Sequence, residues 1–424
     1  MKALIIGGAR SGYGVARLLR SMQYEVYLVS RDDFEKRFEL ENRGVIVSLN
    51  DQDTDAYDDV DLVVKNPGIP NSHPLVSRFD HVINEIEIAT QFHTNGHYYA
   101  ISGTNGKTTT TTLLYEMLLR KDESAVLAGN VGISLSEKVD EIGNADVDVA
   151  LEISAFQIEG TPNFKPDVYA LLNLTPDHLD RFDSEYDYYQ AKLALIPNSK
   201  VFIRNIDDQN IVKLTAKTEN TLDVSLEQQA DITVTDGWAM YKDIKLFDVA
   251  DLKVVGRHNV FNALVAGTIA YMAGVAIVEI QAVIQNFSGV NHRIEYVDTL
   301  NGVQFYNDSK ATNPESTEKA LKAFDGNIIL LAGGYDKHIS FDLLQSYNDK
   351  IKKAFLFGES KVALSKVFDN YDMVQDMASA FHKALKIAKP GDIVLLSPAC
   401  ASYDQFENFE ARGDYFKKMV NDLK

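Results

Sequence analysis

Gly103-Thr-Asn-Gly-Lys-Thr108 follows the apolar run Tyr98-Tyr-Ala-Ile101 and leads into four more threonines. An apolar strand, a glycine turn, a lysine and a hydroxyl residue at the start of a helix are, in this order, the parts of a loop that binds nucleotide phosphates. Lys107 can reach the terminal phosphates, and Thr108 can bind Mg²⁺ through its hydroxyl. We therefore predict an ATP site formed by Gly103, Thr104, Asn105, Gly106, Lys107, Thr108 and Thr109.

This loop departs from the usual phosphate-binding pattern at Ile101, where a first glycine normally stands. The alternative is a glycine turn that only begins a helix. A run of five threonines is a poor helix former, which favours the phosphate interpretation. The motif indicates a bound phosphate but does not identify the reaction.

Composition excludes several classes of protein. The chain has 424 residues, enough for two or three domains, and a formal net charge of −19. Without a long basic run, nucleic-acid binding is not expected as a main role. The single cysteine, Cys400, excludes an internal disulfide framework and suits a reducing cytoplasm. Neither a signal peptide nor a run long enough to span a bilayer is recognised, so we expect a cytoplasmic protein with no membrane partner.

The first 30 residues have a nucleotide-binding βαβ pattern. Lys2 to Ile6 and Glu25 to Val29 are predicted strands, and a glycine turn leads from the first into a helix. The turn does not match the dinucleotide fingerprint, so a smaller anionic nucleotide is considered, with Ser11 and Arg31 as polar contacts. The alternative, which the sequence supports equally, is that Ser11 caps the helix and Arg31 is a solvated surface residue. Asn66-Pro-Gly68 follows a third strand, at the end of a strand where ligands bind in open α/β sheets.

Glu152 interrupts the apolar strand Asp148 to Ile153. A carboxylate in such a strand is costly unless it is paired or binds a metal. We predict a Mg²⁺ ligand that faces the phosphate loop; the alternative is an ion pair at the strand end. His178 lies in a polar cluster after the next strand, and we predict that it ligates a metal or orients a substrate. Lys192, on the helix that follows, would by residue type be a surface lysine with an extended stem.

Amide side chains occur at two further places. The turn 128–132 can present Asn130. Asn259 and Asn262 lie one turn apart on a helix predicted to end at Met272, so they can face one ligand, and amides suit the edge of adenine. The alternative is that Asn259 caps this helix. Between these regions, residues 209–253 are expected to be irregular, with short strand-like pieces.

A third α/β unit is predicted from about Gly289 onward. Four apolar runs each end in polar or glycine residues, and helical patterns lie between them. These runs are Gln304–Tyr306, Ile328–Leu331, Lys353–Leu356 and Ile393–Leu396. The pattern is typical of an open parallel sheet that carries its functional residues at the carboxyl ends of its strands.

Taken together, these motifs resemble the Mur ligase family over essentially the whole chain. The segments that carry the resemblance are the phosphate loop in a shortened form, Asp308-Ser-Lys-Ala-Thr-Asn313, Gly333-Gly-Tyr-Asp-Lys337 and Ser397-Pro-Ala-Cys-Ala-Ser-Tyr-Asp-Gln-Phe406. The last three resemble the member that adds D-glutamate. The resemblance implies an α/β fold with a Rossmann-like N-terminal domain (1–93), a central P-loop ATPase domain (94–290) and a Rossmann-like C-terminal domain (291–424). These domains would bind the UDP end of the substrate, ATP and the amino acid, respectively.

The resemblance also implies a reaction. ATP would phosphorylate the carboxylate of UDP-N-acetylmuramoyl-L-alanine, and the amine of D-glutamate would attack the acyl phosphate through a tetrahedral intermediate. It implies two Mg²⁺ ions, a carbamate on Lys192 and a place in peptidoglycan precursor synthesis. We also expect a monomer. The alternatives are a related Mur-type ligase with another amino acid and an ATP-dependent phosphotransferase that releases its phosphorylated product.

Roles carry over from the family to matching positions. The expected catalytic residues are Lys107, Glu152, His178, Lys192 and Lys310, and the metal ligands are Thr108, Glu152, His178 and Lys192. Beside the phosphate loop, the ATP contacts are Asn259, Asn262, Arg293 and Asp308. The residues expected to bind the UDP end of the substrate are Ser11, Ser30 and Arg31, and those expected to bind its muramoyl-alanine end are Asn130 and His178. The D-glutamate contacts are Thr312, Lys337, Ser402 and Phe409.

Overall fold

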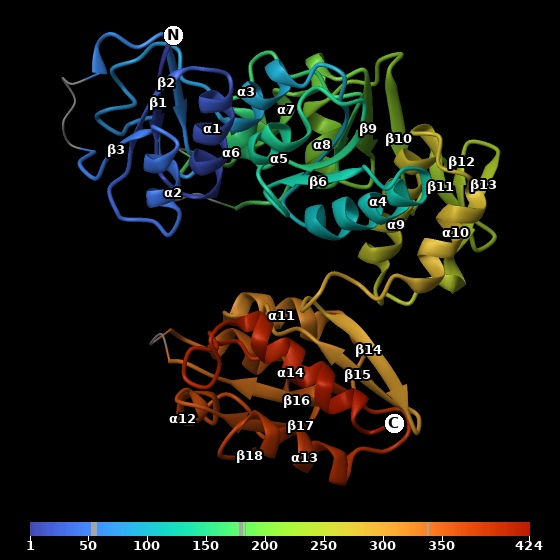
Figure 1. Cartoon of the computed structure of the whole chain (residues 1–424). Helices are drawn as coiled ribbons and strands as arrows, with labels where there is room; N and C mark the ends of the chain where they lie inside the picture. The colour runs from blue at the N-terminus through green and yellow to red at the C-terminus, as the bar shows by residue number, and fades with distance from the viewer. Residues whose placement is uncertain (52–56, 178–180, 183, 337–338) are drawn as a thin grey trace. The chain divides into compact units, whose positions relative to one another are not determined.

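The computed structural model describes residues 1–51, 57–177, 181–182, 184–336 and 339–424, and the strands in this part of the chain form three sheets (Figure 1). The chain separates into two compact units. Unit 1 comprises residues 1–250 and 260–283, and unit 2 comprises residues 251–259 and 284–424. Unit 1 contains the N-terminal and central sheets, and unit 2 contains the C-terminal sheet. The predicted boundaries after residues 93 and 290 divide the chain more finely and stay predictions.

The N-terminal sheet has four parallel strands in the order β3-β2-β1-β4. Its central strand β1 is apolar and almost fully buried, as expected for a parallel strand covered on both faces. The elements of this part are β1 (Lys2–Ile6), α1 (Arg10–Ser21), β2 (Glu25–Val29), α2 (Arg37–Asn42), β3 (Ile46–Ser48), β4 (Leu62–Lys65) and α3 (Glu85–Phe92). The predicted βαβ start is confirmed.

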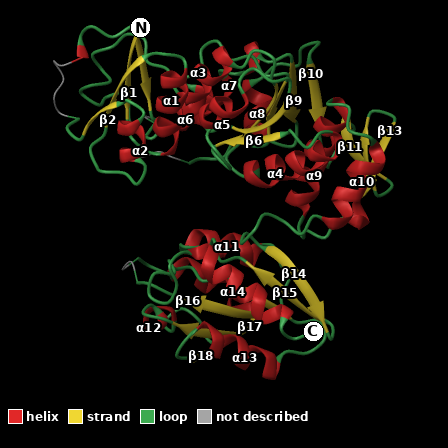
Figure 2. Cartoon of the chain, viewed as in Figure 1, coloured by secondary structure: helices red, strands yellow, loops and turns green. Residues whose placement is uncertain are grey.

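Helix α1 joins the N-terminal sheet to the central part of unit 1 by packing on α5 (Leu135–Ile142). Figure 2 shows α1, α3 and α5 between the two sheets. Gly14 allows the close approach, because a Cβ atom at this position would lie 2.2 Å from the Oγ atom of Ser134. Arg17 then pairs with Glu137 at 3.5 Å and with Asp140 at 2.9 Å. Since Gly14 and Arg17 are three residues apart, they lie on one face of α1.

The central sheet has nine strands in the order β13-β12-β11-β10-β9-β8-β5-β7-β6. Strands β5 to β11 pair in parallel where they are neighbours, whereas β11, β12 and β13 pair antiparallel. The strands are β5 (His97–Ser102), β6 (Val126–Gly129), β7 (Asp148–Glu152), β8 (Val168–Leu171), β9 (Val201–Asn205), β10 (Thr221–Val224), β11 (Ile232–Thr235), β12 (Trp238–Tyr241) and β13 (Ile244–Asp248). The helices are α4 (Lys107–Lys121), α5, α6 (Ala155–Ile158), α7 (Glu185–Leu193), α8 (Gln209–Leu214), α9 (Arg257–Met272) and α10 (Ile277–Asn286). Helix α9 begins in the part of the chain assigned to unit 2 and continues in unit 1.

The short strand-like pieces expected within residues 209–253 are present as β11 and β12, but the expectation that the rest of this region is irregular is wrong. This region contains α8 and the strands β10 to β13, which extend the central sheet. Asp236 and Gly237 join β11 to β12 with φ angles of 50° and 80°. An Asp-Gly pair with positive φ angles is the usual two-residue connection of a β-hairpin. The strands are only four or five residues long, so β10 and β13 did not stand out from the surrounding sequence.

The C-terminal sheet of unit 2 has the strand order β14-β15-β19-β16-β17-β18. Its strands are β14 (Glu295–Leu300), β15 (Val303–Asn307), β16 (Ile328–Gly333), β17 (Ile351–Phe357), β18 (Tyr371–Met373) and β19 (Ile393–Leu396), and its helices are α11 (Pro314–Lys322), α12 (Lys361–Leu364), α13 (Met377–Ile387) and α14 (Phe409–Asn421). The parallel sheet predicted here is present, but its first strand is antiparallel, because β14 and β15 form a hairpin. Short 3₁₀ helices occupy Ile196–Asn198, Val249–Asp251 and Asp342–Lys350.

No helix in the described part of the chain combines the length and the apolar character needed to cross a bilayer.

Because Gly14 lies against Ser134, we predict that Gly14→Val lowers the free energy of unfolding by about 1–3 kcal/mol, the usual cost of overpacking a tight contact. The measurement is urea unfolding followed by circular dichroism. Gly274→Asn is the matched control: a Cβ atom there meets nothing within 4 Å, and Asn tolerates positive φ angles such as the 89° of Gly274. Equal unfolding midpoints for the two variants would contradict the prediction.

Candidate active site

The phosphate loop lies between the carboxyl end of β5 and the first residue of α4, Lys107. Gly103 and Gly106 have φ angles of 148° and 83°, which side chains rarely adopt. A Cβ atom at Gly106 would lie 2.6 Å from Oδ1 of Asn262, so the loop is closely packed where it meets α9. The Nζ atom of Lys107 donates to the carbonyls of Gly103 and Thr104, both at 2.9 Å. The glycine turn, the helix N-terminus and the lysine are therefore arranged as a phosphate cradle requires, and the predicted contacts with ATP stay predictions.

Asn173, just after β8, holds the phosphate loop in place. Its Oδ1 atom accepts from the backbone N–H of Asn105 at 2.8 Å, and its Nδ2 atom donates to the carbonyl of Asn105 at 3.0 Å. The hydroxyl of Thr104 donates to the carbonyl of Thr175 at 3.0 Å. Asn173 was not predicted, because an asparagine after a strand is not distinctive in a sequence. Only the pairing of β5 with β8 brings it beside the phosphate loop.

Glu152, at the end of β7, lies beside the start of this loop because its backbone pairs with Ile101 in β5. The side chain is 1% exposed, and its Oε1 atom accepts from Nδ2 of Asn130 at 2.6 Å. Its Oε2 atom is buried and has no hydrogen-bond partner among the described residues. A buried carboxylate oxygen without a donor is costly, and a bound cation would remove that cost. Glu152 therefore fits a Mg²⁺ ligand, and Asn130 orients it.

Lys192 is buried, at 1% exposure, so the expectation of a surface lysine is wrong. Its Nζ atom donates to the carbonyl of Gly103 at 3.0 Å and lies 4.8 Å from the ring centroid of Tyr188. Burial lowers the pKa of Lys192 to about 7; the ammonium of Lys107 adds to this effect, whereas Asp177 and Glu152 oppose it. Helix α7 thus places the amine against the phosphate loop, where the residue type alone gave no reason to expect it.

The other residues predicted around the phosphate loop are Thr108, Thr109, Asn262 and His178. Thr108 and Thr109 lie in the first turn of α4, and Asn262 packs against Gly106. His178 lies outside the described residues, so its predicted role stays a prediction. Among the described residues, no group of three or more His, Cys, Asp or Glu side chains is arranged to hold a metal ion.

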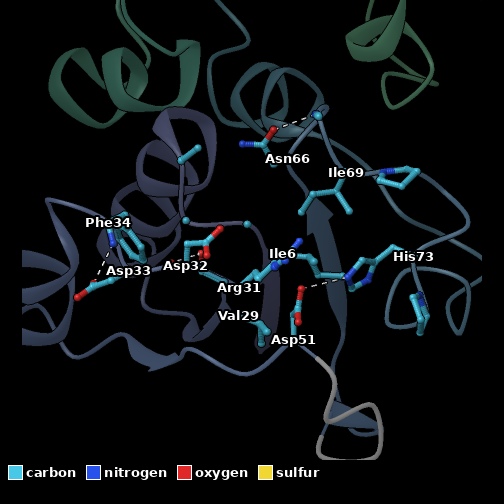
Figure 3. A pocket seen from close by; sticks show the side chains of 17 residues that line it. Ile6, Val29, Arg31, Asp32, Asp33, Phe34, Asp51, Asn66, Ile69 and His73 are labelled. Atoms are coloured by element: carbon cyan, nitrogen blue, oxygen red, sulfur yellow. Dashed lines mark hydrogen bonds and ion pairs between the residues drawn. The ribbon is translucent and has the colours of Figure 1, made fainter. Parts of the chain in front are cut away.

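A pocket opens at the carboxyl ends of the N-terminal strands (Figure 3). Ser30 and Arg31 line this pocket together with Asn66, and their predicted contact with the UDP end stays a prediction. Phe34 lies over the glycine turn, since a Cβ atom at Gly8 would be 2.4 Å from the Phe34 ring. Ser11 is the second residue of α1 and is not among the described residues that line the pocket.

The pocket also contains residues that the sequence analysis missed. His73 and Asp51 lie on one side, with 3.3 Å between Nε2 and Oδ2. The backbone N–H of Leu75 donates to Nδ1 of His73 at 3.3 Å, so Nε2 carries the proton and donates to Asp51. A lone histidine and a loop aspartate gave no usable sequence signal.

In unit 2, Lys310 and Phe409 lie near each other. The Nζ atom of Lys310 is 5.6 Å from the centroid of the Phe409 ring, and the hydroxyl of Ser309 donates to the carbonyl of Phe409 at 2.8 Å. The backbone N–H of Lys310 donates to the carbonyl of His292 at 2.9 Å, and that of Thr312 donates to the carbonyl of Lys310 at 2.9 Å. These bonds form a tight turn that presents an exposed ammonium group.

Arg412 connects the two loops that carry the predicted residues of unit 2. Its guanidinium is fully buried and donates to the hydroxyl and carbonyl of Ser309, at 2.9 and 2.8 Å. It also donates to the carbonyls of Cys400 and Ala401, at 3.0 and 3.3 Å. Burial lowers the pKa of Arg412 to about 10. Lys310 and the buried Ser402 are therefore held by one side chain that the sequence analysis did not select.

Asp308 is also buried, at 4% exposure. One carboxylate oxygen accepts from the hydroxyl of Ser397 at 2.6 Å and the other from the backbone N–H of Ile294 at 3.1 Å. Burial raises the pKa of Asp308 to about 7, against the effect of these donors. Ile294 has a φ angle of 44°, which is rare for a β-branched residue, so Asp308 supports a strained turn. The predicted contact of Asp308 with a ribose stays a prediction.

The other predicted residues of unit 2 remain untested. Arg293 is exposed, next to that strained turn. Asn259 donates from Nδ2 to the carbonyl of Val255 at 2.7 Å, within the first turn of α9. Lys337 lies outside the described residues.

The comparisons with known proteins cover the whole chain. The family described as Mur ligase middle domain matches residues 101–270, and the family described as Mur ligase, glutamate ligase domain matches residues 292–400. UDP-N-acetylmuramoylalanine–D-glutamate ligase of Ligilactobacillus salivarius (strain UCC118) is 36% identical, over 100% of this chain and 96% of the relative. The ligase of the same name from Bacillus subtilis (strain 168) is 36% identical, over 99% of this chain and 97% of the relative.

Solved structures of lower identity have the same fold. The UDP-N-acetylmuramate-alanine ligase of Thermotoga maritima has a TM-score of 0.59 at 18% identity, with 100% of both chains covered. A pseudomurein peptide ligase type C from Methanothermus fervidus has a TM-score of 0.57 at 18% identity, also with 100% of both chains covered.

Because Asn173 binds both backbone groups of Asn105, we predict that Asn173→Ala weakens ATP binding roughly 5- to 30-fold, as expected for the loss of about 1–2 kcal/mol of hydrogen bonding. Isothermal titration with a non-hydrolysable ATP analogue measures the affinity. Asn198→Ala is the control, since it removes an amide-to-carbonyl bond to Pro162 of similar type. The same affinity in both variants would show that Asn173 does not hold the loop.

Proposed function

This chain belongs to the Mur ligase family, and from that membership we propose that it joins D-glutamate to UDP-N-acetylmuramoyl-L-alanine while ATP is converted to ADP and phosphate. The observation that carries the proposal is similarity over the full length to ligases of this name, at about 36% identity. The phosphate loop supports the ATP-dependent half of the reaction, as does the buried Oε2 atom of Glu152 beside it, for which the described residues supply no hydrogen-bond partner.

The first step transfers a phosphoryl group between two anions. A carboxylate oxygen of the alanyl group bonds to the γ-phosphorus, the bond to the β-bridging oxygen breaks, and ADP leaves. Because like charges repel, most of the catalysis must come from positive groups and exact placement. The N-terminus of α4 supplies a fixed positive dipole, and Lys107 supplies a full charge.

Lys107 must change partners when ATP binds. Its Nζ atom now donates to two carbonyls of its own loop, which are neutral acceptors. Bonds from an ammonium to phosphate oxygens are charge-assisted and stronger, so the terminal phosphates would draw the lysine away from those carbonyls.

Thr108 and Glu152 would hold Mg²⁺, which supplies further neutralisation of the phosphate charge when bound. The buried Oε2 atom of Glu152 is the structural reason for assigning it this role, and Asn130 keeps the other oxygen in place. A second Mg²⁺ ion, with His178 and Lys192 as ligands, remains part of the proposal on family resemblance.

In the second step the amine nitrogen of D-glutamate bonds to the acyl carbon, phosphate leaves, and the nitrogen loses a proton. Lys310 is an exposed ammonium on a turn fixed by the carbonyl of His292, so it can stabilise the oxyanion of the tetrahedral intermediate. Thr312, Lys337, Ser402 and Phe409 would bind the amino acid. The D-glutamate specificity, the cytoplasmic location and the monomeric state belong to this proposal.

The test of the function measures phosphate release from ATP with Mg²⁺ and UDP-N-acetylmuramoyl-L-alanine, with D-glutamate, L-glutamate, meso-diaminopimelate or L-lysine as acceptor. Release together with a new amide only with D-glutamate is the expected result. Lys107→Gln should lower kcat on the order of 10²-fold or more through loss of transition-state charge stabilisation. Lys121→Gln is the control on the same helix, because Lys121 pairs with Asp148 instead.

Two outcomes would change the assignment. Amide formation with another amino acid would keep the ligase chemistry and replace the acceptor. A stable phosphorylated product in the absence of any amino acid would identify a phosphotransferase.

Lys192 is proposed to carry a carbamate. Carbamate formation bonds the uncharged amine nitrogen to the carbon of CO₂ and releases a proton. The amine of Lys192 is buried beside the phosphate loop, where an anionic oxygen could face a metal but an ammonium could not.

We predict that the protein equilibrated with ¹³C-bicarbonate shows a carbamate resonance by NMR, and that Lys192→Arg loses it because a guanidinium does not form this adduct. Lys200→Arg is the control, since Lys200 is exposed and pairs with Asp167 at 2.5 Å. A resonance that survives in Lys192→Arg, or its absence in the wild-type protein, would contradict the carbamate.

A further inference from the structure

Arg10 is the first residue of α1, directly after the glycine turn of the N-terminal pocket. Its guanidinium binds three backbone carbonyls of the loop that follows β6. Nη1 donates to Gly132 at 2.7 Å, and Nη2 donates to Gly129 at 3.0 Å and to Asn130 at 3.2 Å. The neighbouring residues Gly7, Gly8 and Ala9 line the pocket, so one short segment touches both the pocket and this loop.

The loop that Arg10 binds carries Asn130. It is tightly turned: Gly129 has a φ angle of 99°, and a Cβ atom there would lie 2.2 Å from the carbonyl oxygen of Glu152. The backbone N–H of Asn130 donates to that same carbonyl at 2.9 Å, and its side chain donates to Oε1 of Glu152 at 2.6 Å. A chain of bonds therefore runs from Arg10 through the loop to the carboxylate of Glu152, whose Oε2 atom has no hydrogen-bond partner in the described part of the chain.

Three carbonyl oxygens that converge on one point repel one another unless a cation with several donors lies between them. A guanidinium has donors in a fixed planar fork and can serve all three at once, whereas an ammonium is a point charge without this geometry. Loss of the guanidinium would leave the carbonyls to water and free the loop to move. Asn130 would then hold Glu152 less precisely.

We propose that Arg10 is a positioning residue that fixes Asn130 and Glu152 for metal binding, and so joins the N-terminal pocket to the metal side of the ATP site. The inference rests on the proposed function, because it assumes that Glu152 binds the metal. It assigns the side chain of Arg10 to the loop and not to the nucleotide pocket. Its role is in the geometry of the metal ligand, and Arg10 itself touches no reacting atom.

The test uses Mn²⁺ as a spectroscopic substitute for Mg²⁺. Binding of Mn²⁺ in the presence of ADP is measured by electron paramagnetic resonance, and binding of UDP is measured by calorimetry. Arg10→Met, which keeps the aliphatic stem, should weaken Mn²⁺ binding about tenfold, the lower end of the effect of residues that orient metal ligands. Arg10→Lys should lie between Arg10→Met and the wild type, and UDP affinity should stay at its wild-type value in both.

Arg17→Met is the matched control. Arg17 lies two turns along the same helix and pairs with Glu137 and Asp140 of α5, so its loss loosens the same contact between helices without touching the loop. Mn²⁺ binding by Arg17→Met should equal that of the wild type. Thermal unfolding of each variant identifies any protein that fails to fold, in which case Arg10→Lys carries the test.

Three results would overturn the inference: wild-type Mn²⁺ binding by Arg10→Met, an equal loss in Arg17→Met, or a loss of UDP affinity as large as the loss of Mn²⁺ affinity. The last would make Arg10 a ligand of the diphosphate or a general support of the fold. Failure of the proposed function is distinguishable, because it shows in the phosphate-release and amide assay of the wild-type protein, whereas failure of the metal assignment shows as a wild-type protein that does not bind Mn²⁺ with ADP.

Discussion

The parallel pairing of β5 with its two neighbours is the constraint on which the ATP site depends. The register that sets Ile101 opposite Glu152 places a carboxylate beside the first residue of the phosphate loop. Pairing on the other side, with β8, brings Asn173 to the backbone of that loop. None of these groups is near another in sequence, and a shift of register by one residue would turn each side chain to the opposite face of the sheet. The backbone hydrogen bonds of the sheet thus bring these groups together.

In unit 2 the predicted residues lie on loops and not at strand ends alone, so the positions of these loops must be fixed by other contacts. A buried guanidinium is normally an expensive group, and Arg412 is stabilised by four backbone or hydroxyl acceptors from two loops. Removal of either loop would leave this buried charge with two of its four acceptors. The positions of Lys310 and Ser402 are therefore coupled to each other through the cost of burying Arg412.

Much of this structure could be predicted from the sequence, and the parts that could not have identifiable physical reasons. The phosphate loop was visible because strand, glycines and lysine are contiguous, and Glu152 was visible because a carboxylate in an apolar strand is anomalous. The motifs at residues 308–313, 333–337 and 397–406 resemble those of a known family, and this resemblance predicted functional roles that the residue types alone could not. Burial of Lys192, in contrast, depends on where α7 packs, and no local pattern separates a buried lysine from a surface one. Asn173, Arg412 and Arg10 act through backbone carbonyls and amides of distant segments, so they become recognisable only when the tertiary contacts are known.

The close approach of α1 to α5 at Gly14 restricts the replacement of the N-terminal part of this chain by recombination. Nucleotide-binding βαβ modules are widespread, and the first of these sheets looks like one that recombination could replace. Its helix α1, however, carries on one face the glycine and the arginine that fit α5, while its first turn carries the arginine that fits the loop after β6. A substitute module with a bulky residue at that glycine would be held away from α5, however well it bound its own nucleotide. Compatibility at this helix face, and not only the fold of the module, limits which N-terminal modules the rest of the chain can accept.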